Sequence, residues 1–147
     1  MTAKVKIKKL DEKAIVPTYG TEYSAGADLY NAEEAPVTIE AGETRLIHTG
    51  LSFEIPEGCA GFIFARSGLA AKRGLAPANK VGVVDSDYRG EVMVSLFNQS
   101  SQPQTVEYGE RIAQMVIMPF VKADFEISEK LGDTVRGKGG FGSTGMK

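Results

Sequence analysis

The sequence predicts an all-β fold built in one domain. Short runs of apolar and β-branched residues recur along the chain, and turn residues separate them, which is typical of a β-sandwich or barrel. With 147 residues, of which 42% are hydrophobic, the chain has the size of one domain around one core. The runs expected to form strands are residues 5–8, 37–39, 45–47, 51–55, 61–64, 81–84, 92–97, 112–118 and 125–127.

These elements have local reasons in the sequence. Residues 5–8 alternate apolar and polar side chains, as a half-buried strand does. One short helix is expected over residues 67–73, because Ser67 is a candidate N-cap, helix formers follow it, and Gly74 can end the helix. Turns between the later strands are expected at residues 41–42, 56–58, 98–103 and 108–109.

Residues 81–92 carry more chemistry than the other predicted strands. Two apolar runs flank a polar loop that holds two carboxylates, a tyrosine and an arginine, namely Asp85, Asp87, Tyr88 and Arg89. We expect a β-hairpin with this loop at its tip. A turn needs only Gly, Asn or one Asp for its backbone angles, so the loop has more reactive groups than a turn requires. The stretch also fits a solvated hairpin in which Asp85 only caps the turn.

Composition limits the classes of function. A net charge of −2 argues against bulk nucleic-acid binding, which needs a basic face. The chain has no apolar run near the roughly 18 residues of a membrane span, and residues 1–5 lack the features of a signal peptide. We therefore expect a cytoplasmic protein without a nucleic-acid or membrane partner. Because Cys59 and His48 are single, any metal must be held mostly by oxygen.

The C-terminal segment, residues 136–147, differs in composition from residues 1–135. Five glycines fall within residues 136–145, so we expect a flexible segment that orders only when it binds something. Its cations, hydroxyls and exposed amides suit phosphate oxygens, and Phe141 can stack on a flat ring. Residues 137–142 match the pattern G-x-G-x-x-G only formally, because no strand and helix flank them. A disordered tail is the alternative interpretation.

Two further stretches place cations beside polar groups. Arg66 and Ser67 stand at the expected start of the helix, where backbone amides favour an anion. An ordinary Ser cap with a solvated Arg66 is the alternative. Arg111 and Gln114 are three residues apart in a predicted strand, and so lie on opposite faces if the strand is regular. They can share a site only through a bulge, a strand end or a neighbouring subunit.

Five stretches, in this order, resemble the five motifs of the trimeric deoxyuridine triphosphatase (dUTPase) family. They are Ala25-Gly-Ala-Asp-Leu29, Ala65-Arg-Ser-Gly-Leu-Ala70, Gly82-Val-Val-Asp-Ser-Asp-Tyr-Arg-Gly-Glu91, Gly109-Glu-Arg-Ile-Ala-Gln114 and Arg136-Gly-Lys-Gly-Gly-Phe-Gly-Ser-Thr-Gly145. The resemblance implies a distorted jelly roll of the β-clip type, with one short helix and a flexible glycine-rich lid over residues 136–147. It also implies a homotrimer whose active sites are shared between subunits.

The resemblance assigns roles residue by residue. Asp85 matches the carboxylate that activates the attacking water, and Gln114 the residue that helps to hold this water and the α-phosphate. Tyr88 matches the aromatic residue that packs on deoxyribose and leaves no space for a 2′-hydroxyl. The other matches are Asn79, Gly82 and Val83 for uracil, Arg66, Ser67 and Gly68 for phosphates, Arg136, Phe141, Gly142, Ser143 and Thr144 for the lid, and Asp28 and Arg111 for supporting contacts.

The implied reaction is hydrolysis of dUTP to dUMP and pyrophosphate, which keeps uracil out of DNA and supplies dUMP for thymidylate synthesis. Mg²⁺ would be held by the substrate phosphates and water, with no direct protein ligand. Since an aspartate is a poor general base near neutral pH, most of the acceleration must come from alignment and from cations. Alternatives on the same fold are a dCTP deaminase-like enzyme and a non-catalytic nucleotide-binding regulator.

Overall fold

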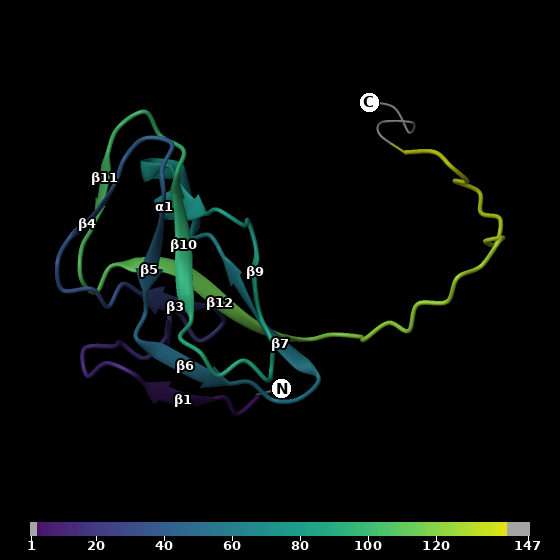
Figure 1. Cartoon of the computed structure of the whole chain (residues 1–147), viewed down its shortest axis with the longest axis horizontal. Helices are drawn as coiled ribbons and strands as arrows, with labels where there is room; N and C mark the ends of the chain where they lie inside the picture. Colours follow the sequence, from purple (N-terminus) through teal and green to yellow (C-terminus); the bar gives the residue numbers. More distant parts are fainter. Residues whose placement is uncertain (1–2, 141–147) are drawn as a thin grey trace.

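The chain folds mainly into short antiparallel strands, in a computed structural model that describes residues 3–140 (Figure 1). The largest sheet has the strand order β2-β3-β12-β7-β9. Its strands are β2 (Thr18–Tyr19), β3 (Ala27–Tyr30), β7 (Cys59–Phe64), β9 (Gly82–Val84) and β12 (Arg111–Pro119). A second sheet has the order β5-β10-β8, with β5 (Thr44–His48), β8 (Leu75–Pro77) and β10 (Met93–Asn98).

Two strand pairs complete the described sheets. β1 (Lys6–Lys9) pairs with β6 (Leu51–Glu54), and β4 (Val37–Ile39) pairs with β11 (Gln104–Val106). The larger sheets share one core, because residues of β3, β7 and β12 and residues of β5 and β10 belong to the same buried cluster. In β10 buried and half-buried residues alternate, which is the period of a strand with one face toward a core. The predicted all-β class is confirmed.

The predicted helix is present as α1 (Ser67–Arg73). It ends at Gly74, whose φ of 67° lies in the left-handed region that glycine adopts without a steric penalty. The expected cap is wrong: Ser67 is the first helical residue, and Arg66 occupies the N-cap position without a side-chain cap bond. The side chain of Arg66 instead turns to Asp28, at 2.7 Å.

The predicted β-hairpin over residues 81–92 is also wrong. β9 pairs with β7, whereas β10 pairs with β5 and β8. Residues 85–92 therefore connect two sheets, and we call them the connecting loop. Hydrophobic alternation identifies a strand and its buried face but not its partner, and successive strands are not always neighbours in a sheet.

After β12 the chain leaves the body as an extended arm, residues 121–140 (Figure 1). Phe120 donates the last backbone bond to the body, at 3.1 Å from the carbonyl oxygen of Gly58. The predicted strand over residues 125–127 is wrong, since none of the described strands includes these residues and Phe125 and Ile127 are at least 92% exposed. None of the helices in the described part of the chain could span a membrane.

Candidate active site

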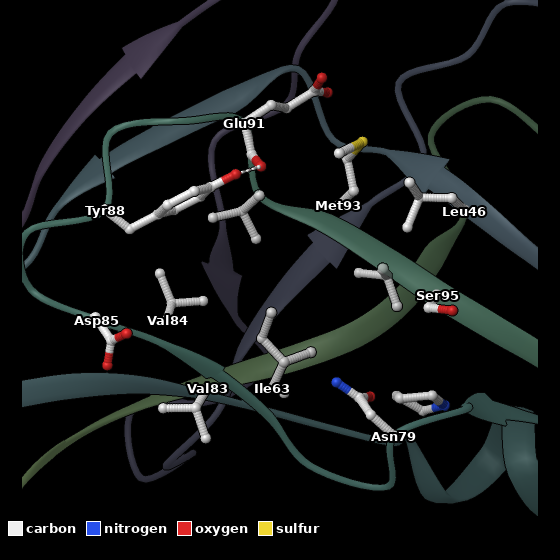
Figure 2. Close-up of a pocket in the computed structure, with 14 residues that line it drawn as sticks. Leu46, Ile63, Asn79, Val83, Val84, Asp85, Tyr88, Glu91, Met93 and Ser95 are labelled. Carbon is white, nitrogen blue, oxygen red and sulfur yellow. Dashed lines mark hydrogen bonds between the residues drawn. The ribbon is translucent and has the colours of Figure 1, made fainter.

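A cavity of about 330 Å³ opens beside the connecting loop (Figure 2). Its volume falls within the range of small-molecule sites. Five of the site residues expected from sequence line it, namely Asn79, Gly82, Val83, Asp85 and Tyr88. Apolar side chains from neighbouring strands form much of the remaining wall, among them Ile63 and Leu46. The cavity thus combines an apolar wall with a few polar groups, as ligand sites typically do.

The backbone of β9 is available along one side of this cavity. β9 is one of the two edge strands of its sheet, and an edge strand presents backbone N–H and C=O groups to any partner. Gly82 allows β9 to approach β7 closely, because a Cβ at this position would lie 3.2 Å from the Cβ of Ile63. A flat ring that carries amide-like groups can pair with such an edge as a further strand would.

A carboxylate and an aromatic ring stand on the connecting loop. Asp85 is exposed and lines the cavity, and its backbone carbonyl accepts a bond of 3.2 Å from the backbone N–H of Tyr88. The Tyr88 ring is 44% exposed, and its Oη donates a hydrogen bond of 2.9 Å to the backbone carbonyl of Glu91 (Figure 2). The turn therefore keeps a proton acceptor and a flat apolar surface at one cavity.

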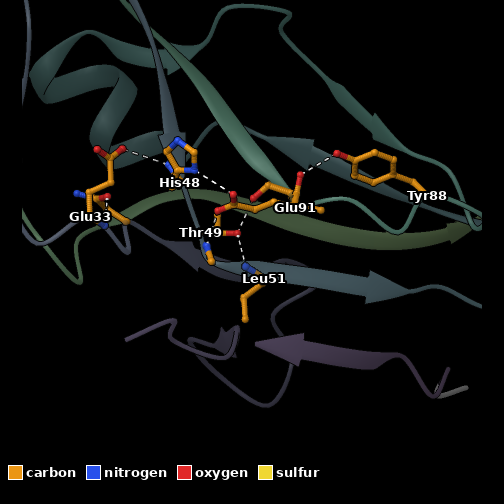
Figure 3. A network of polar contacts seen from close by, with 9 residues as sticks. Glu33, His48, Thr49, Leu51, Tyr88 and Glu91 are labelled. Atoms are coloured by element: carbon orange, nitrogen blue, oxygen red, sulfur yellow. Dashed lines mark hydrogen bonds and ion pairs between the residues drawn. The ribbon is translucent and has the colours of Figure 1, made fainter. Parts of the chain in front are cut away.

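Glu91 fastens the connecting loop to the corner between β5 and β6 (Figure 3). Its side chain accepts a bond of 2.8 Å from the backbone N–H of Gly50 and lies 2.9 Å from Nδ1 of His48. This hydrogen bond, helped by the charges of Glu91 and Glu33, raises the pKa of His48 above 6.5, although partial burial opposes the shift. The sequence pattern did not mark Glu91, because its partners are more than 40 residues away.

A second group of expected residues gathers around Asp28 on β3. The Asp28 side chain is buried, and its Oδ1 accepts a bond of 2.7 Å from Nε of Arg66. Its Oδ2 accepts a bond of 3.3 Å from Nη1 of Arg111. Two guanidinium groups thus meet at one carboxylate, which leaves a net positive charge for an incoming anion. Ser67 and Gly68 are exposed at the adjacent start of α1.

Gln114 joins this second group through a β-bulge. The register of β12 against β3 shifts between Arg111 and Ala113, and Ile112 and Ala113 are both fully buried. The bulge is one of the three arrangements that would let Arg111 and Gln114 share a site. The amide of Gln114 donates a bond of 2.9 Å to the backbone carbonyl of Ala65.

Gly26 makes room for the side chain of Gln114. A Cβ at Gly26 would lie 3.0 Å from Cδ of Gln114 and 3.1 Å from its Cβ, and still closer to its Oε1. The Gln114 amide therefore occupies space that any other residue at position 26 would fill. Sequence reasoning did not single out Gly26 as a site residue, since the reason for it is a contact with a distant strand.

The structure does not bring the two groups together within one chain. Ile63 lines the cavity, whereas the next residue, Phe64, stands opposite Gln114 in the sheet. Successive strand residues project from opposite faces, so Ile63 lies on the other face of β7 from Gln114. Neither Arg66 nor Gln114 is among the residues that line the cavity.

The lid residues are described only in part. Arg136 lies exposed in the arm, and its Nε donates a bond of 2.8 Å to the backbone carbonyl of Gly139. Phe141, Gly142, Ser143 and Thr144 lie outside the described residues. Between residues 3 and 140, no group of three or more His, Cys, Asp or Glu side chains is arranged to hold a metal ion.

Comparisons with known proteins agree with this architecture. The family model described as dUTPase matches residues 12–145. A protein of Desulfitobacterium hafniense named deoxyuridine 5′-triphosphate nucleotidohydrolase is 50% identical over 146 residues, which cover 97% of each chain. A protein of the same name from Nautilia profundicola is 51% identical over 97% of this chain and 99% of its own. The dUTPase of Staphylococcus bacteriophage 80alpha, solved with dUPNHPP, has a TM-score of 0.90 at 28% identity and covers 99% of this chain.

The fold is therefore a jelly roll of short antiparallel strands, with one small helix among residues 3–140. Within that class, the family-model match over residues 12–145 and the relatives that are about 50% identical identify the family. The chain belongs to the dUTPase family.

Proposed function

We propose that this protein hydrolyses dUTP to dUMP and pyrophosphate in the cytoplasm, which keeps uracil out of DNA and supplies dUMP for thymidylate synthesis. The observation that carries the proposal is the cavity, because the edge backbone of β9, the Asp85 carboxylate and the Tyr88 ring all line it. The backbone edge can pair with a base, the carboxylate can act at the reacting centre, and the ring can pack on a sugar. Relatives that bear the name of this activity match nearly the whole chain, which supports the proposal further.

In the proposed reaction Asp85 accepts a proton from a water molecule whose oxygen attacks the α-phosphorus. The bond from this phosphorus to the oxygen that bridges toward the β-phosphorus breaks, and its electron pair leaves with pyrophosphate. Gln114 holds the water and the α-phosphate in line. Arg66, Ser67 and Gly68 bind the phosphates, so that positive charge and backbone amides stabilise the transition state.

At the other end of the substrate, Asn79 and the backbone of Gly82 and Val83 read uracil through hydrogen bonds. The position of β9 at a sheet edge supports this role. Tyr88 packs on the deoxyribose and leaves no space for a 2′-hydroxyl. A site that excludes a group by contact needs a wall in a fixed place, and the hydrogen bond from Tyr88 to Glu91 supplies one.

We propose that Mg²⁺ enters the site on the substrate phosphates. Mg²⁺ usually keeps several waters and binds through phosphates with one or two carboxylates. Asp85, the exposed carboxylate in the cavity, can accept hydrogen bonds from the waters of an ion that the phosphates carry, without binding the ion directly. When bound there, the ion supplies positive charge that neutralises the phosphates.

The separation of the two residue groups supports a homotrimer with shared sites. The cavity of one chain would face the Arg66 and Gln114 group of another copy. The arm supports the same assembly, because it alternates Val121, Phe125 and Ile127 with polar residues and exposes each of these three by at least 92%. Such an exposed alternating segment can bury its apolar face only on another surface.

The activity is tested by offering dUTP, dCTP, dTTP and UTP with Mg²⁺ and measuring pyrophosphate and ammonia. We expect pyrophosphate from dUTP and little from the other three. Release of ammonia from dCTP would point to a deaminase. Recovery of bound dUTP unchanged after hours would point to a regulator without catalysis.

Shared sites are tested by mixing two inactive variants. Asp85→Asn chains are defective in the residues that line the cavity, the cavity group, and Arg66→Ala chains in the residues around Asp28, the cation group. Mixed trimers therefore regain sites with both groups intact. As a matched control, Asp85→Asn mixed with Tyr88→Ala should regain nothing, because every cavity group is then defective. Mixed trimers that stay inactive, with their composition verified by native mass spectrometry, would contradict shared sites.

The lid is tested by truncation. We propose that residues 136–147 close over the bound nucleotide, with Arg136, Ser143 and Thr144 on the phosphates and Phe141 with Gly142 over the base. Deleting them should reduce turnover by about 100-fold, the scale of a misplaced substrate, while the circular dichroism spectrum stays unchanged. An unaffected rate would refute the lid.

A further inference from the structure

The ring of Tyr88 is held in place by two neighbours in the chain. Its Oη bonds to the backbone carbonyl of Glu91 at 2.9 Å (Figure 3). The ring also lies so close to Gly90 that a Cβ built there would be 2.6 Å from its Cζ and 2.9 Å from its Cε2. Carbon atoms in contact normally lie about 3.5–4.0 Å apart, so only glycine at position 90 leaves the ring where it is.

The acceptor of the Tyr88 bond cannot easily follow a moving ring. Glu91 is fixed through its side chain to the backbone N–H of Gly50, at 2.8 Å, and to His48, at 2.9 Å. The next residue, Val92, donates its backbone N–H to the carbonyl of Leu51 at 2.8 Å. The Glu91 carbonyl is therefore a fixed reference point, and the ring position depends on the space above Gly90.

We propose that Gly90 is a positioning residue that sets the Tyr88 ring against the sugar and thereby decides how well the site distinguishes deoxyribose from ribose. The inference rests on the proposed hydrolysis of dUTP, in which this ring leaves no space for a 2′-hydroxyl. Contact excludes a hydroxyl only while the ring stays in its place. A methyl group at position 90 displaces the ring and breaks its bond to Glu91, so the contact that excludes a 2′-hydroxyl is lost.

An alanine at position 90 is a clean probe of the ring. Gly90 is not among the described glycines with positive φ, such as Gly50 at 65°, so alanine brings no backbone strain there. The three nearest atoms to the added Cβ all belong to the side chain of Tyr88, which can rotate. The effect of the substitution therefore falls on the tyrosine.

The experiment compares kcat/KM for dUTP and UTP in the full-length protein and in Gly90→Ala. We expect the ratio of the two values to fall by about tenfold or more, with KM for dUTP raised more than kcat is lowered. Gly20→Ala is the matched control, because its Cβ would meet only Ser24 Oγ, at 3.7 Å. That variant should keep the wild-type ratio. A wild-type ratio in Gly90→Ala overturns the inference.

A double-mutant cycle separates the effect of Gly90→Ala on the Tyr88 ring from its effect on the backbone. Tyr88→Ala removes the ring, so adding Gly90→Ala to it should change the ratio by less than about twofold. A further fall as large as in the single variant would mean that Gly90 acts without the ring, and the inference would be wrong. If the wild-type protein itself released no pyrophosphate from dUTP, the proposed function would fail and this inference with it.

Discussion

The two groups of site residues hold their carboxylates in opposite ways. Asp85, on the connecting loop, is exposed at the cavity. Asp28, on β3, is buried, and each of its oxygens accepts a bond from a guanidinium group. One carboxylate is left accessible to solvent and substrate, whereas the other orients two cations.

This difference explains why residues of the same type take different roles. A carboxylate whose two oxygens both accept bonds from guanidinium groups, as in Asp28, can accept a proton only by giving up one of these bonds. An exposed carboxylate beside a cavity can accept a proton from water without breaking an ion pair. The cavity group is therefore suited to chemistry on solvent, and the cation group to binding the charged part of a substrate.

The largest effect is expected from Asp85→Asn. The amide keeps the shape of the side chain but cannot accept a proton from water, so turnover should fall by about 10²–10⁴-fold. Binding of dUPNHPP, measured by titration calorimetry, should be retained. Asp87→Asn, two residues away in the same loop, is the matched control and should keep most of the turnover. Near-normal turnover in Asp85→Asn would refute the assigned role.

A smaller loss is expected in the cation group from Gly26→Ala. The added Cβ displaces the Gln114 amide from its bond to Ala65. A misplaced positioning group can cost up to about 100-fold, so we expect kcat to fall by about tenfold to 100-fold. In a Gln114→Ala background the same change should cost much less. Equal losses in both backgrounds would show that Gly26 acts through the fold of β3.

Much of the fold could be predicted from local sequence. Alternation placed most of the longer strands, and Gly74 correctly ended the helix, because both signals depend on neighbouring residues. The pairing of β9 with β7 could not be predicted, because a pattern of buried faces does not choose a partner. The strands β2, β8 and β11 are only two or three residues long, show no period and were not predicted, whereas the equally short β4 and β9 were predicted from their β-branched residues.

The site could be predicted as residues but not as an arrangement. The five residues expected on and beside the connecting loop do line one cavity, and Asp28, Arg66 and Arg111 do meet. That these form two separate groups depends on strand pairing between distant parts of the chain, which local patterns do not specify. Gly26 and Glu91 act through contacts with residues far away in the sequence, and Gly90 acts through a ring two residues away whose orientation the sequence does not show.

A moderate effect on stability is expected from Asp28→Asn. The neutral side chain leaves two guanidinium groups without their shared carboxylate. Loss of a buried charged hydrogen-bond partner costs about 1–3 kcal/mol. Because Arg66 and Arg111 are 26% and 50% exposed and regain water, we expect the lower part of that range, about 1–2 kcal/mol. Urea unfolding measures this loss in the free energy of unfolding. Asp124→Asn, on the exposed arm, is the control and should leave the free energy of unfolding unchanged.

The smallest effect is expected on the cavity side, at His48. Its pKa is raised in the folded protein, first of all by the hydrogen bond to Glu91, so the folded state binds the imidazole proton more tightly than the unfolded state does. The resulting stabilisation is complete below the unfolded pKa of about 6.5 and is lost as pH rises through the higher folded value. Its size is below about 1 kcal/mol, because the side chain is 51% exposed and solvent screens the pair.

The measurement is the difference in urea midpoint between wild type and His48→Ala at several pH values. The wild-type advantage should be largest near pH 5.5 and should shrink toward pH 9, since the protonated imidazole gains more from Glu91 than the neutral ring does. Glu91 keeps its bond to the backbone N–H of Gly50 in either state, so kcat for dUTP should change by less than about twofold. An advantage that grows with pH would mean that the neutral ring makes the stabilising contact. A large fall in kcat would mean that His48, and not Gly50, fixes the connecting loop.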